Sequence, residues 1–415
     1  MKEAAPVDTV ERKRFLPYGR QNISEADIQS VVEVLRSDWL TQGPAVPRFE
    51  EKLCEWMGTP NAVACANGTA ALHLAMLALG IGPGDQVLTT PITFLASANC
   101  ARYVGADVRF ADVDAATGLM DPAATARVLE ADRDHRIKAI IPVHFAGQPV
   151  DLGAFEQMAK AHGAALVDDA CHALGAQIRR EGAWVPIGQR ADGGLSVFSF
   201  HPVKHVTTGE GGAVTTSNER LAERLRVFRT HGIQKCDFQN EAMAMDPGGE
   251  VNPWYYEQQM LGFNYRLTDI QAALGASQMG MLPASIQKRN SLAVCYAQAI
   301  QSAFPEGGVQ GLDQRPDIVN AYHLYVARID FARFGVTRGA VMQRLRAAGI
   351  GTQVHYIPVH LQPYYQTHSK TRPGDFPQAE AFYASALSLP MFPELTEADV
   401  HRVVEELARC LGVLR

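Results

Sequence analysis

The segment 196–212 is the part of the 415-residue sequence that is best suited to chemistry, because one lysine stands there among apolar, hydroxyl and glycine residues. An apolar β-type run ends at Phe198, and Lys204 follows in the sequence Ser199-Phe-His-Pro-Val-Lys, just before a glycine-rich turn. A lysine shielded from water loses part of its proton affinity, and its neutral amine can then attack an aldehyde. An ordinary surface lysine on a loop also fits the pattern, so this segment by itself leaves both interpretations open.

A second candidate is the pair of carboxylates, Asp168 and Asp169, that follows the apolar run 164–167. An acid at the carboxyl end of a parallel strand faces the crevice in which α/β proteins bind ligands. A carboxylate in that place keeps a pyridine nitrogen protonated, which makes the ring an electron sink. Helix capping and solvation explain one of the two acids equally well, and the alternation of side chains does not decide which acid points inward.

Two further motifs could hold a planar, phosphorylated cofactor. In 64–72 an Asn-Gly turn precedes a helical pattern, whose first N–H groups would form a phosphate cradle with the hydroxyl of Thr69. This signal is weak, because it is neither a Walker loop nor a dinucleotide-binding fingerprint. Phe94 could stack on a planar ring or belong to the core. A phosphate cradle, an aromatic face, an acid and a lysine are together what pyridoxal 5'-phosphate (PLP) requires.

These side chains need a sheet that brings several strand ends together. Between residues 62 and 216, short apolar runs alternate with helical patterns, and several runs show no polar alternation. This predicts an α/β fold with a mostly parallel central sheet covered by helices on both faces. The predicted strands are 62–65, 86–89, 108–111, 139–142, 165–167, 195–198 and 213–216. The predicted helices are 70–79, 95–104, 122–131, 151–162 and 218–230.

The remaining parts of the chain predict an N-terminal helix and a second domain. Ser24 is the expected N-cap of helix 24–36. After residue 281 the pattern changes to that of a smaller α+β domain, with a helix over 285–302, a strand over 322–329 and helices over 338–348, 377–387 and 396–411. We therefore expect a large cofactor domain over 15–281 and a small C-terminal domain over 282–415.

Composition disfavours several other classes of protein. The 44 acidic residues outnumber the 38 basic ones, and a formal net charge of -6 is unfavourable for a nucleic-acid binder. The uncharged stretch 56–84 has an apolar part, 70–81, that is too short to span a bilayer. Residues 1–14 lack the apolar run of a signal peptide, and the seven scattered cysteines fit neither a disulfide framework nor a zinc site. We expect a cytoplasmic protein without a metal, and with neither nucleic acid nor a membrane as partner.

Read in order, the motifs resemble the DegT/StrS family of sugar-nucleotide aminotransferases, which have the PLP-dependent aspartate-aminotransferase fold (type I). The resemblance runs from about Phe15 to the C-terminus. Its motifs are Gly19-Arg-Gln, Leu40-Thr-Gln-Gly-Pro44, Asn67-Gly-Thr69, Thr90-Pro-Ile-Thr-Phe94, Asp169-Ala-Cys-His-Ala173, Ser199-Phe-His-Pro-Val-Lys204, Glu210-Gly-Gly212 and Gly262-Phe-Asn-Tyr-Arg-Leu-Thr-Asp-Ile-Gln271. Trp39-Leu-Thr-Gln and Pro253-Trp-Tyr-Tyr are similar to the branch that aminates C4 of a UDP-4-keto-6-deoxy-HexNAc in pseudaminic acid synthesis.

The resemblance implies a role for each residue that matches these motifs around the cofactor ring. Lys204 would form the internal aldimine, Asp169 would pair with the pyridine nitrogen, and Phe94 would stack on the ring. His172 would lie near the cofactor hydroxyl, and His201 would line the same pocket. Lys204 also argues against the relatives that carry histidine at this position and perform dehydration.

The resemblance also implies a phosphate site and a homodimer. Gly68, Thr69 and Ser199 would hold the phosphate of the cofactor. Asn264 and Arg266 would reach into the site of the neighbouring subunit, so that a homodimer with sites at the subunit interface is the functional unit.

The sugar nucleotide requires a further set of contacts, for which the segments 322–325 and 353–360 of the small domain are candidates. The resemblance places the segment 353–360 near the sugar, and the expected substrate-binding residues are Thr41, Gln42, His355, Tyr356 and His360. Local hydrogen bonding to the backbone explains His355 and His360 equally well. The expected reaction is transfer of the amino group of glutamate to UDP-4-keto-6-deoxy-L-AltNAc.

Three alternatives remain open at this stage. The same chemistry could act on another keto sugar, such as UDP-4-keto-6-deoxy-GlcNAc or GDP-4-keto-6-deoxy-mannose. A non-catalytic protein that binds sugar nucleotides would share the fold, although the presence of Lys204 and Asp169 disfavours it. A nucleotide-binding regulator is disfavoured because the dinucleotide and Walker fingerprints are missing.

Overall fold

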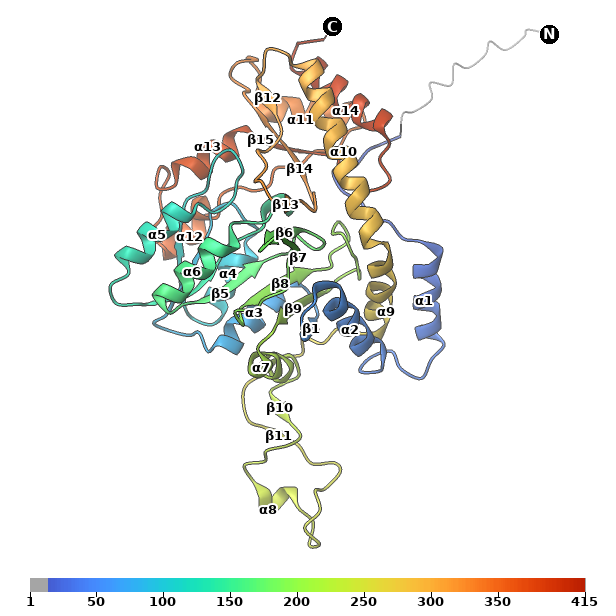
Figure 1. Ribbon diagram of the computed structural model, residues 1–415, viewed down its shortest axis with the longest axis vertical. Coiled ribbons are helices and arrows are strands. Elements are labelled where there is room, and N and C mark those ends of the chain that lie inside the picture. The colour runs from blue at the N-terminus through green and yellow to red at the C-terminus, as the bar shows by residue number, and fades with distance from the viewer. Residues whose placement is uncertain (1–13, 415) are drawn as a thin grey trace, which may run out of the picture.

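The computed structural model describes residues 14–414, in which a seven-stranded sheet has helices on both faces and a smaller sheet lies near the C-terminus (Figure 1). Residues 1–13, where we expect no signal peptide, lie outside the described part of the chain. The strands of the large sheet are β1 (Asn61–Cys65), β2 (Gln86–Thr89), β3 (Asp107–Phe110), β4 (Ile137–Ile141), β5 (Ala165–Asp169), β8 (Leu195–Ser199) and β9 (Gly212–Thr216). All seven predicted strands are present, within one or two residues of their predicted ends.

The topology of this sheet places the candidate lysine at a strand end. The strand order is β1-β9-β8-β5-β4-β2-β3. From β8 to β3 the neighbouring strands run parallel, whereas β9 runs antiparallel to both β8 and β1. The mostly parallel sheet is therefore confirmed. Lys204 lies on the connection between β8 and β9, just beyond the carboxyl end of β8.

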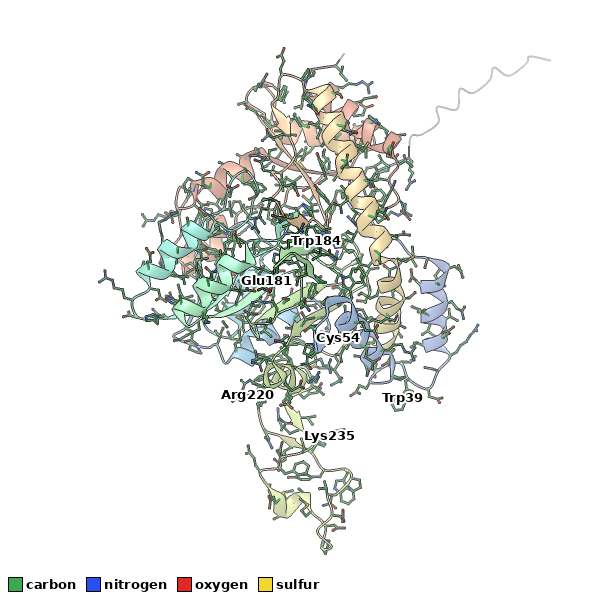
Figure 2. The ribbon with its side chains drawn as sticks, in the orientation of Figure 1. Trp39, Cys54, Glu181, Trp184, Arg220 and Lys235 are labelled. Atoms are coloured by element: carbon green, nitrogen blue, oxygen red, sulfur yellow. The ribbon has the colours of Figure 1, made fainter. Side chains whose placement is uncertain are left out.

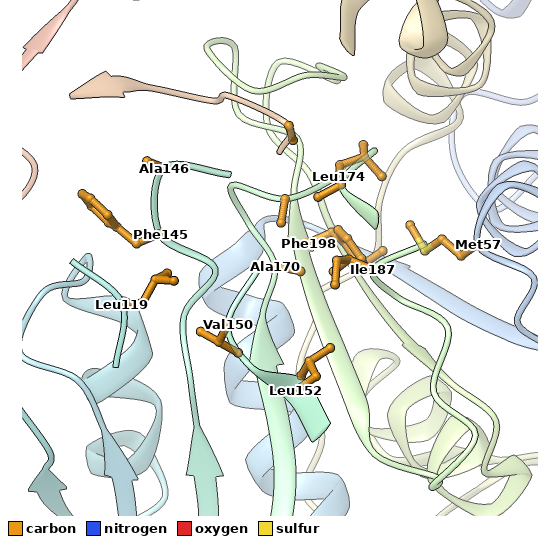
Figure 3. Packing of buried hydrophobic residues seen from close by; sticks show 14 of the residues in the cluster. Met57, Leu119, Phe145, Ala146, Val150, Leu152, Ala170, Leu174, Ile187 and Phe198 are labelled. Carbon is orange, nitrogen blue, oxygen red and sulfur yellow. The ribbon is translucent and has the colours of Figure 1, made fainter. Parts of the chain in front are cut away.

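The two faces of the sheet carry separate hydrophobic clusters. Along β1, Ala62 and Ala64 belong to one cluster, and Val63 and Cys65 belong to the other, because successive side chains of a strand point to opposite faces. The helices α3 (Gly68–Leu79), α4 (Ala96–Tyr103) and α7 (Glu219–Arg229) cover one face. The helices α2 (Ala45–Met57), α5 (Pro122–Ala131) and α6 (Leu152–His162) cover the other. In Figure 3, Phe198 of β8 packs beside Ile187 and toward Met57 of α2.

The sequence pattern missed α2 and the helix α9 (Asp269–Gln278), which precedes η2 (Met279–Met281) and α10 (Leu282–Ala303). α2 is amphipathic and buries Phe49, Leu53 and Met57 on one side, but it has no side-chain N-cap, because Pro44 precedes it. The pattern also missed a small antiparallel sheet. That sheet consists of β6 (Gln177–Arg180), β7 (Ala183–Pro186) and the two-residue strand β13 (Ile318–Val319).

The C-terminal part contains the expected mixture of helices and strands, with corrected ends. Its sheet has the order β12-β14-β15, with β12 (Val309–Gln310), β14 (Tyr325–Ile329) and β15 (Ala386–Leu389). β14 begins three residues later than predicted, because Tyr322 has a φ of +46°. The helix predicted over 377–387 ends at Ser385, and the residues that follow pair with β14 as β15. The helices are α11 (Arg338–Ala347), η3 (Val359–Leu361), α12 (Pro363–His368), α13 (Pro377–Ser385) and α14 (Glu397–Cys410).

The C-terminal sheet and its helices have their own core. That cluster is formed by residues 292–411 together with Leu16. Val359, Tyr365 and Phe376, however, pack against the cluster of α3 and α4, so the chain returns to the larger part before it ends. The division at 281/282 stays a prediction.

Two outlying segments complete the fold. α1 (Glu25–Leu35) begins with a full capping box between Ser24 and Asp27. Beyond α7, an arm with β10 (Ile233–Gln234), α8 (Glu241–Ala244) and β11 (Glu257–Gln258) projects away from the body of the molecule (Figure 1), and Lys235 marks its base in Figure 2. η1 (Phe145–Gly147) follows β4. In residues 14–414 we find no helix with the length and apolarity needed to cross a bilayer.

Candidate active site

A cavity of about 440 Å³ opens where β5 and β8 end, between the large sheet and segments of the C-terminal part. It brings together ten of the residues singled out from the sequence, which are Gly68, Thr69, Phe94, Asp169, His172, Ser199, His201, Lys204, His355 and Tyr356. These residues come from segments up to 288 positions apart, from Gly68 to Tyr356. Their convergence agrees with the rule that ligands bind at the carboxyl ends of parallel strands.

Lys204 faces this cavity in a setting that favours its neutral amine. Burial lowers the pKa of Lys204, and the nearby Cys171 and Asp169 only partly oppose this effect. Its Nζ lies 3.5 Å from Nε2 of His323, whose pKa burial also depresses far below the ordinary value of histidine. The lysine is therefore a shielded amine beside a neutral imidazole, and the interpretation as an ordinary surface lysine is wrong.

Asp168 and Asp169 point to opposite sides of β5. Asp169 lines the cavity, where its Oδ2 accepts a 2.6 Å hydrogen bond from Ser97 and its Oδ1 accepts one of 3.1 Å from the N–H of Cys171. Asp168 lies in the core and is fully buried. The strand places its side chains alternately on the two faces, so Asp169 is the acid of the site.

The core position of Asp168 is satisfied by a set of charged and polar partners. Its Oδ1 pairs with Arg190 and accepts a 3.0 Å hydrogen bond from Ser196, and its Oδ2 lies 3.2 Å from His144. Burial by itself raises the pKa of this carboxyl, but Arg190 and the two hydrogen bonds outweigh that effect and bring it to about 2. Asp168 therefore anchors the strand that carries Asp169.

The first turn of α3 forms an anion cradle. The side chain of Asn67 caps the helix by accepting a 2.8 Å hydrogen bond from the N–H of Ala70. The N–H groups of Gly68 and Thr69, at the start of the helix, have no intrahelical partner, and both residues line the cavity. A Cβ on Gly68 would lie 2.9 Å from Cβ of Ser199, so the glycine is what lets this serine approach the helix end. The donor set fits the phosphate of PLP.

His172 and Tyr356 form a hydrogen-bonded pair whose direction the surroundings fix. Nδ1 of His172 accepts a 3.3 Å hydrogen bond from the N–H of Ala146, so Nε2 carries the ring hydrogen. Nε2 lies 3.1 Å from the hydroxyl of Tyr356 and donates to it. Burial holds the pKa of His172 far below its usual value and raises that of Tyr356. The hydroxyl hydrogen of Tyr356 is thus free to donate into the cavity.

Phe94 stands at the rim of the cavity with 56% of its surface exposed, and its ring centroid is 6.2 Å from that of Tyr356. An exposed aromatic face beside Asp169 and Lys204 fits a planar cofactor ring better than it fits a core position. The interpretation of Phe94 as a core residue is therefore wrong.

Several predicted site residues lie outside the cavity. His360 is fully buried, with Nε2 3.0 Å from Oε1 of Glu380, so the structure corrects the expectation of a substrate contact. The partner of its ring is this side chain, 20 positions further along the chain, and not the local backbone. Thr41 and Gln42 are exposed, and Thr41 pairs with Thr268 through the backbone. Neither residue is among the described residues that line the cavity.

Asn264 and Arg266 also lie outside the cavity of the chain that carries them. Asn264 is exposed and pairs with Thr230 where the projecting arm begins. Their contribution to a neighbouring site stays a prediction. Within residues 14–414, no group of three or more His, Cys, Asp and Glu side chains is arranged to hold a metal ion.

The sequence does not indicate the roles of Tyr18 and Ser97, and it suggests His323 only as part of the segment 322–325 for the sugar site, not as a neighbour of Lys204. Tyr18 lines the cavity from the N-terminal segment, and no local signal marks it. Ser97 sits one turn into the helix pattern after Phe94 and was indistinguishable from a core serine. His323 follows the non-glycine positive-φ residue Tyr322, and only the fold shows that it reaches Lys204.

Comparison with known proteins agrees with this site. The model of the DegT/DnrJ/EryC1/StrS aminotransferase family matches residues 21–408. The spore coat polysaccharide biosynthesis protein SpsC of Bacillus subtilis (strain 168) is 39% identical over 398 residues, which cover 95% of this chain and 96% of SpsC.

Solved structures extend the likeness to three dimensions. Helicobacter pylori PseC, an aminotransferase involved in the biosynthesis of pseudoaminic acid, has a TM-score of 0.83 and 31% identity, over 96% of this chain and 100% of PseC. Spr1654 of Streptococcus pneumoniae in its PLP form has a TM-score of 0.82 and 28% identity, over 97% and 100% of the two chains. Because the family model spans nearly the whole chain and the cavity contains the lysine, acid and phosphate cradle that PLP needs, the protein belongs to the DegT/DnrJ/EryC1/StrS family and is a PLP-dependent sugar aminotransferase of fold type I.

Proposed function

We propose that this enzyme transfers the amino group of glutamate to C4 of a UDP-4-keto-6-deoxy-HexNAc, UDP-4-keto-6-deoxy-L-AltNAc in particular. The observation that carries the proposal is the full-length likeness to PseC, whose described pathway makes an amino sugar. The cavity supports it, since it combines a nucleophilic amine with hydrogen-bond donors at its rim.

Each residue of the cavity has a definite task in such a reaction. Lys204 would hold the cofactor covalently, Asp169 would keep its ring nitrogen protonated, and the cradle at Gly68 would bind its phosphate. PLP, when bound, supplies the electron sink that weakens the bond to the reacting hydrogen. The amine of Lys204, freed by the amino donor, would be the base that takes the proton from the α-carbon of the donor. Burial lowers the pKa of this amine, which favours its unprotonated form for that step.

The rim of the cavity supports a role for Tyr356 in orienting the ligand. Its hydroxyl accepts from His172 and therefore presents its own hydrogen to the cavity. Tyr18 and His355 also line the cavity, and the centroids of their two rings are 5.5 Å apart. A hydroxyl-rich sugar matches such a mixed wall of donors and aromatic faces.

We further propose that the functional unit is a homodimer. The arm beyond α7 carries large apolar side chains that are strongly exposed in the single chain, with Trp254 74% and Tyr256 57% exposed, and Leu261 at its end is 78% exposed. An isolated protrusion with so much apolar surface is unfavourable in water, and the arm leads directly to Asn264 and Arg266. A second copy of the chain would cover the arm and bring those two residues to its site.

A second candidate substrate follows from the comparison with SpsC. Its name assigns it to spore coat polysaccharide biosynthesis, and at 39% identity it is no less similar in sequence than PseC. Another 4-keto sugar, such as UDP-4-keto-6-deoxy-GlcNAc or GDP-4-keto-6-deoxy-mannose, is therefore the alternative acceptor for the same chemistry.

The acceptor is identified by an assay of the PLP-loaded enzyme with glutamate and each of the three keto sugars. Both products, 2-oxoglutarate and the amino sugar, are quantified. The proposal expects the highest kcat/KM for UDP-4-keto-6-deoxy-L-AltNAc. A higher value with another keto sugar would select the alternative acceptor. If none of the three is aminated while glutamate still converts the cofactor, the acceptor lies outside this substrate class. Donor identity is tested separately by replacing glutamate with glutamine, aspartate or alanine.

A further inference from the structure

A second cavity, of about 220 Å³, borders Lys204 between the N-terminal segment and the beginning of α10. The basic side chains in its wall are Arg20, Lys288 and Arg289, and His205 lies beside them. The residues assigned above to cofactor and sugar do not explain why so many basic groups gather here.

Arg289 is a buried cation without a carboxylate partner. It is 1% exposed, and its Nη1 donates to the carbonyl oxygens of Tyr322 and Met391 at 3.0 and 3.1 Å. Its Nε has no acceptor among the described residues. Burial lowers the pKa of Arg289 to about 10, and no neighbouring carboxylate in residues 14–414 counteracts the shift. A buried charge is costly unless it is paired, so an anion at this place would stabilise the fold.

Three more buried polar atoms in the same wall lack partners within the described chain: Oγ of Ser285, Nδ1 of His205 and Oδ1 of Asp27. His205 donates from Nε2 to the carbonyl oxygen of Ala321 at 2.9 Å, so its Nδ1 is a free acceptor. Buried polar atoms are normally hydrogen-bonded, and of these four atoms Oγ of Ser285 and Nε of Arg289 are the donors that an anion requires, whereas the other two are acceptors. A volume of 220 Å³ holds a small anion together with several waters of roughly 30 Å³ each.

We propose that this cavity is a binding site for a small oxyanion, a carboxylate or a phosphate, between Lys288 and Arg289. Ser285, Lys288 and Arg289 are spaced i, i+3 and i+4 on α10, which places a hydroxyl and two cations on one side of the helix. The proposal goes beyond the assigned reaction and does not depend on the identity of the sugar.

The other charged side chains in the wall determine how substitutions should change the affinity of the cavity for an anion. Arg20 is engaged by Glu394 at 3.5 Å, which leaves Lys288 and Arg289 as the cations without a carboxylate partner among the described residues. Asp27 opposes an anion, because its Oδ2 is held by Ser24 and Gln278 and its Oδ1 remains an unpaired acceptor. Removing the charge of Asp27 should therefore strengthen binding, whereas removing that of Lys288 should weaken it.

The test is calorimetric titration of the PLP-loaded enzyme at constant ionic strength with inorganic phosphate and, separately, with 2-oxoglutarate. Bound PLP fills the phosphate cradle of α3, and 2-oxoglutarate does not react with this form of the enzyme. We expect saturable binding of at least one anion, a Kd raised about tenfold by Lys288→Gln and a Kd lowered by Asp27→Asn. Lys160→Gln, an exposed charge change on α6, is the matched control and should leave the Kd unchanged.

The two probes separate the sources of the oxyanion. Binding of 2-oxoglutarate without phosphate would assign the site to a carboxylate of the amino donor or its product, and the reverse would assign it to phosphate. Absence of saturable binding for both probes overturns the proposal. So does a Kd that Lys288→Gln and Asp27→Asn both leave unchanged, or both shift in the same direction, since a merely structural effect has no reason to change sign. These outcomes stand apart from the keto-sugar assay, because no sugar is present.

Discussion

Ser97 donates a 2.6 Å hydrogen bond to Oδ2 of Asp169 in a region where both side chains are buried. Because an ionised carboxylate can only accept, the hydrogen of Ser97 is committed to it, and Ser97 in turn accepts a 2.7 Å hydrogen bond from Thr93. The N–H of Cys171 holds the other oxygen of Asp169. The carboxylate of Asp169, which lines the cavity, is thus fixed in orientation by a chain of two hydroxyls and one backbone group.

Replacing Ser97 with alanine should therefore reduce kcat about tenfold while KM changes little. A hydrogen bond to a charged group contributes roughly 1.5–3 kcal/mol, and its loss lets the carboxylate turn away from the ring nitrogen. Ser97→Thr keeps the hydroxyl and should restore most of the rate. The pH dependence of the bound cofactor's visible spectrum gives a second readout. An unchanged kcat and spectrum in Ser97→Ala would show that this hydrogen bond does not position Asp169.

Lys204→Ala should abolish turnover and the visible absorbance that arises from the covalent link between lysine and cofactor. The cradle of α3 and Asp169 remain in this variant, so PLP should still bind, although reversibly. Absorbance spectra after dialysis and single-turnover measurements with glutamate check both statements. Turnover that survives in the variant would contradict the assignment of Lys204.

His355 should make the enzyme sensitive to acid. Burial lowers the pKa of His355 from 6.5 to about 3. Between these two pH values His355 is protonated in the unfolded chain but neutral in the folded chain. The free energy of unfolding therefore falls as the pH drops, by about 1.4 kcal/mol per pH unit. In His355→Asn, where Oδ1 can accept from the hydroxyl of Ser388, this dependence should become shallower. Urea unfolding from pH 7 to pH 4 measures the two slopes, and equal slopes would exclude His355 as their origin.

Gly68→Ala should weaken PLP binding by an order of magnitude or more. The new Cβ would stand 2.9 Å from Cβ of Ser199 and 3.3 Å from Sγ of Cys171, so the serine must withdraw from the phosphate site. Gly339→Ala is the matched control, because nothing lies within 4 Å of its new Cβ in α11, and it should stabilise the fold by up to about 1 kcal/mol. Fluorescence titration of the apoenzymes with PLP compares the two variants; similar affinities would argue against the cradle.

Trp254→Ser combined with Leu261→Ser should shift the enzyme from dimer to monomer. The two side chains expose 74% and 78% of their surface in the single chain, and polar replacements remove the apolar area that a second copy would cover. Sedimentation velocity over a range of concentrations measures the change. The control is Trp184→Ser, because Trp184 is also exposed but lies on β7, away from the arm (Figure 2). This substitution should leave the oligomeric state unchanged. A wild-type protein that sediments as a monomer would refute the proposed dimer.

Local sequence patterns were sufficient for much of the fold. Short apolar runs identified all seven strands of the large sheet, and several of these runs show no polar alternation, because a strand covered by helices on both faces buries both sets of side chains. The edge strand β3 differs, since its Asp107 and Arg109 are exposed. Patterns failed where tertiary contacts define an element. β15 was read as the end of a helix, and its four residues form a strand because β14 offers them backbone partners.

The sequence by itself determined the chemistry of this protein, since an isolated lysine after a strand, an acid at a strand end and a turn leading into a helix are local motifs with local causes. Strand alternation alone leaves Asp168 and Asp169 equivalent and only the resemblance selects Asp169; the tertiary structure supplies the physical reason, because it gives Asp168 arginine and histidine partners in the core. It likewise removed His360 from the site and brought His323 to Lys204. Contacts between residues more than 100 positions apart depend on how the two parts of the chain pack, and no local pattern encodes them.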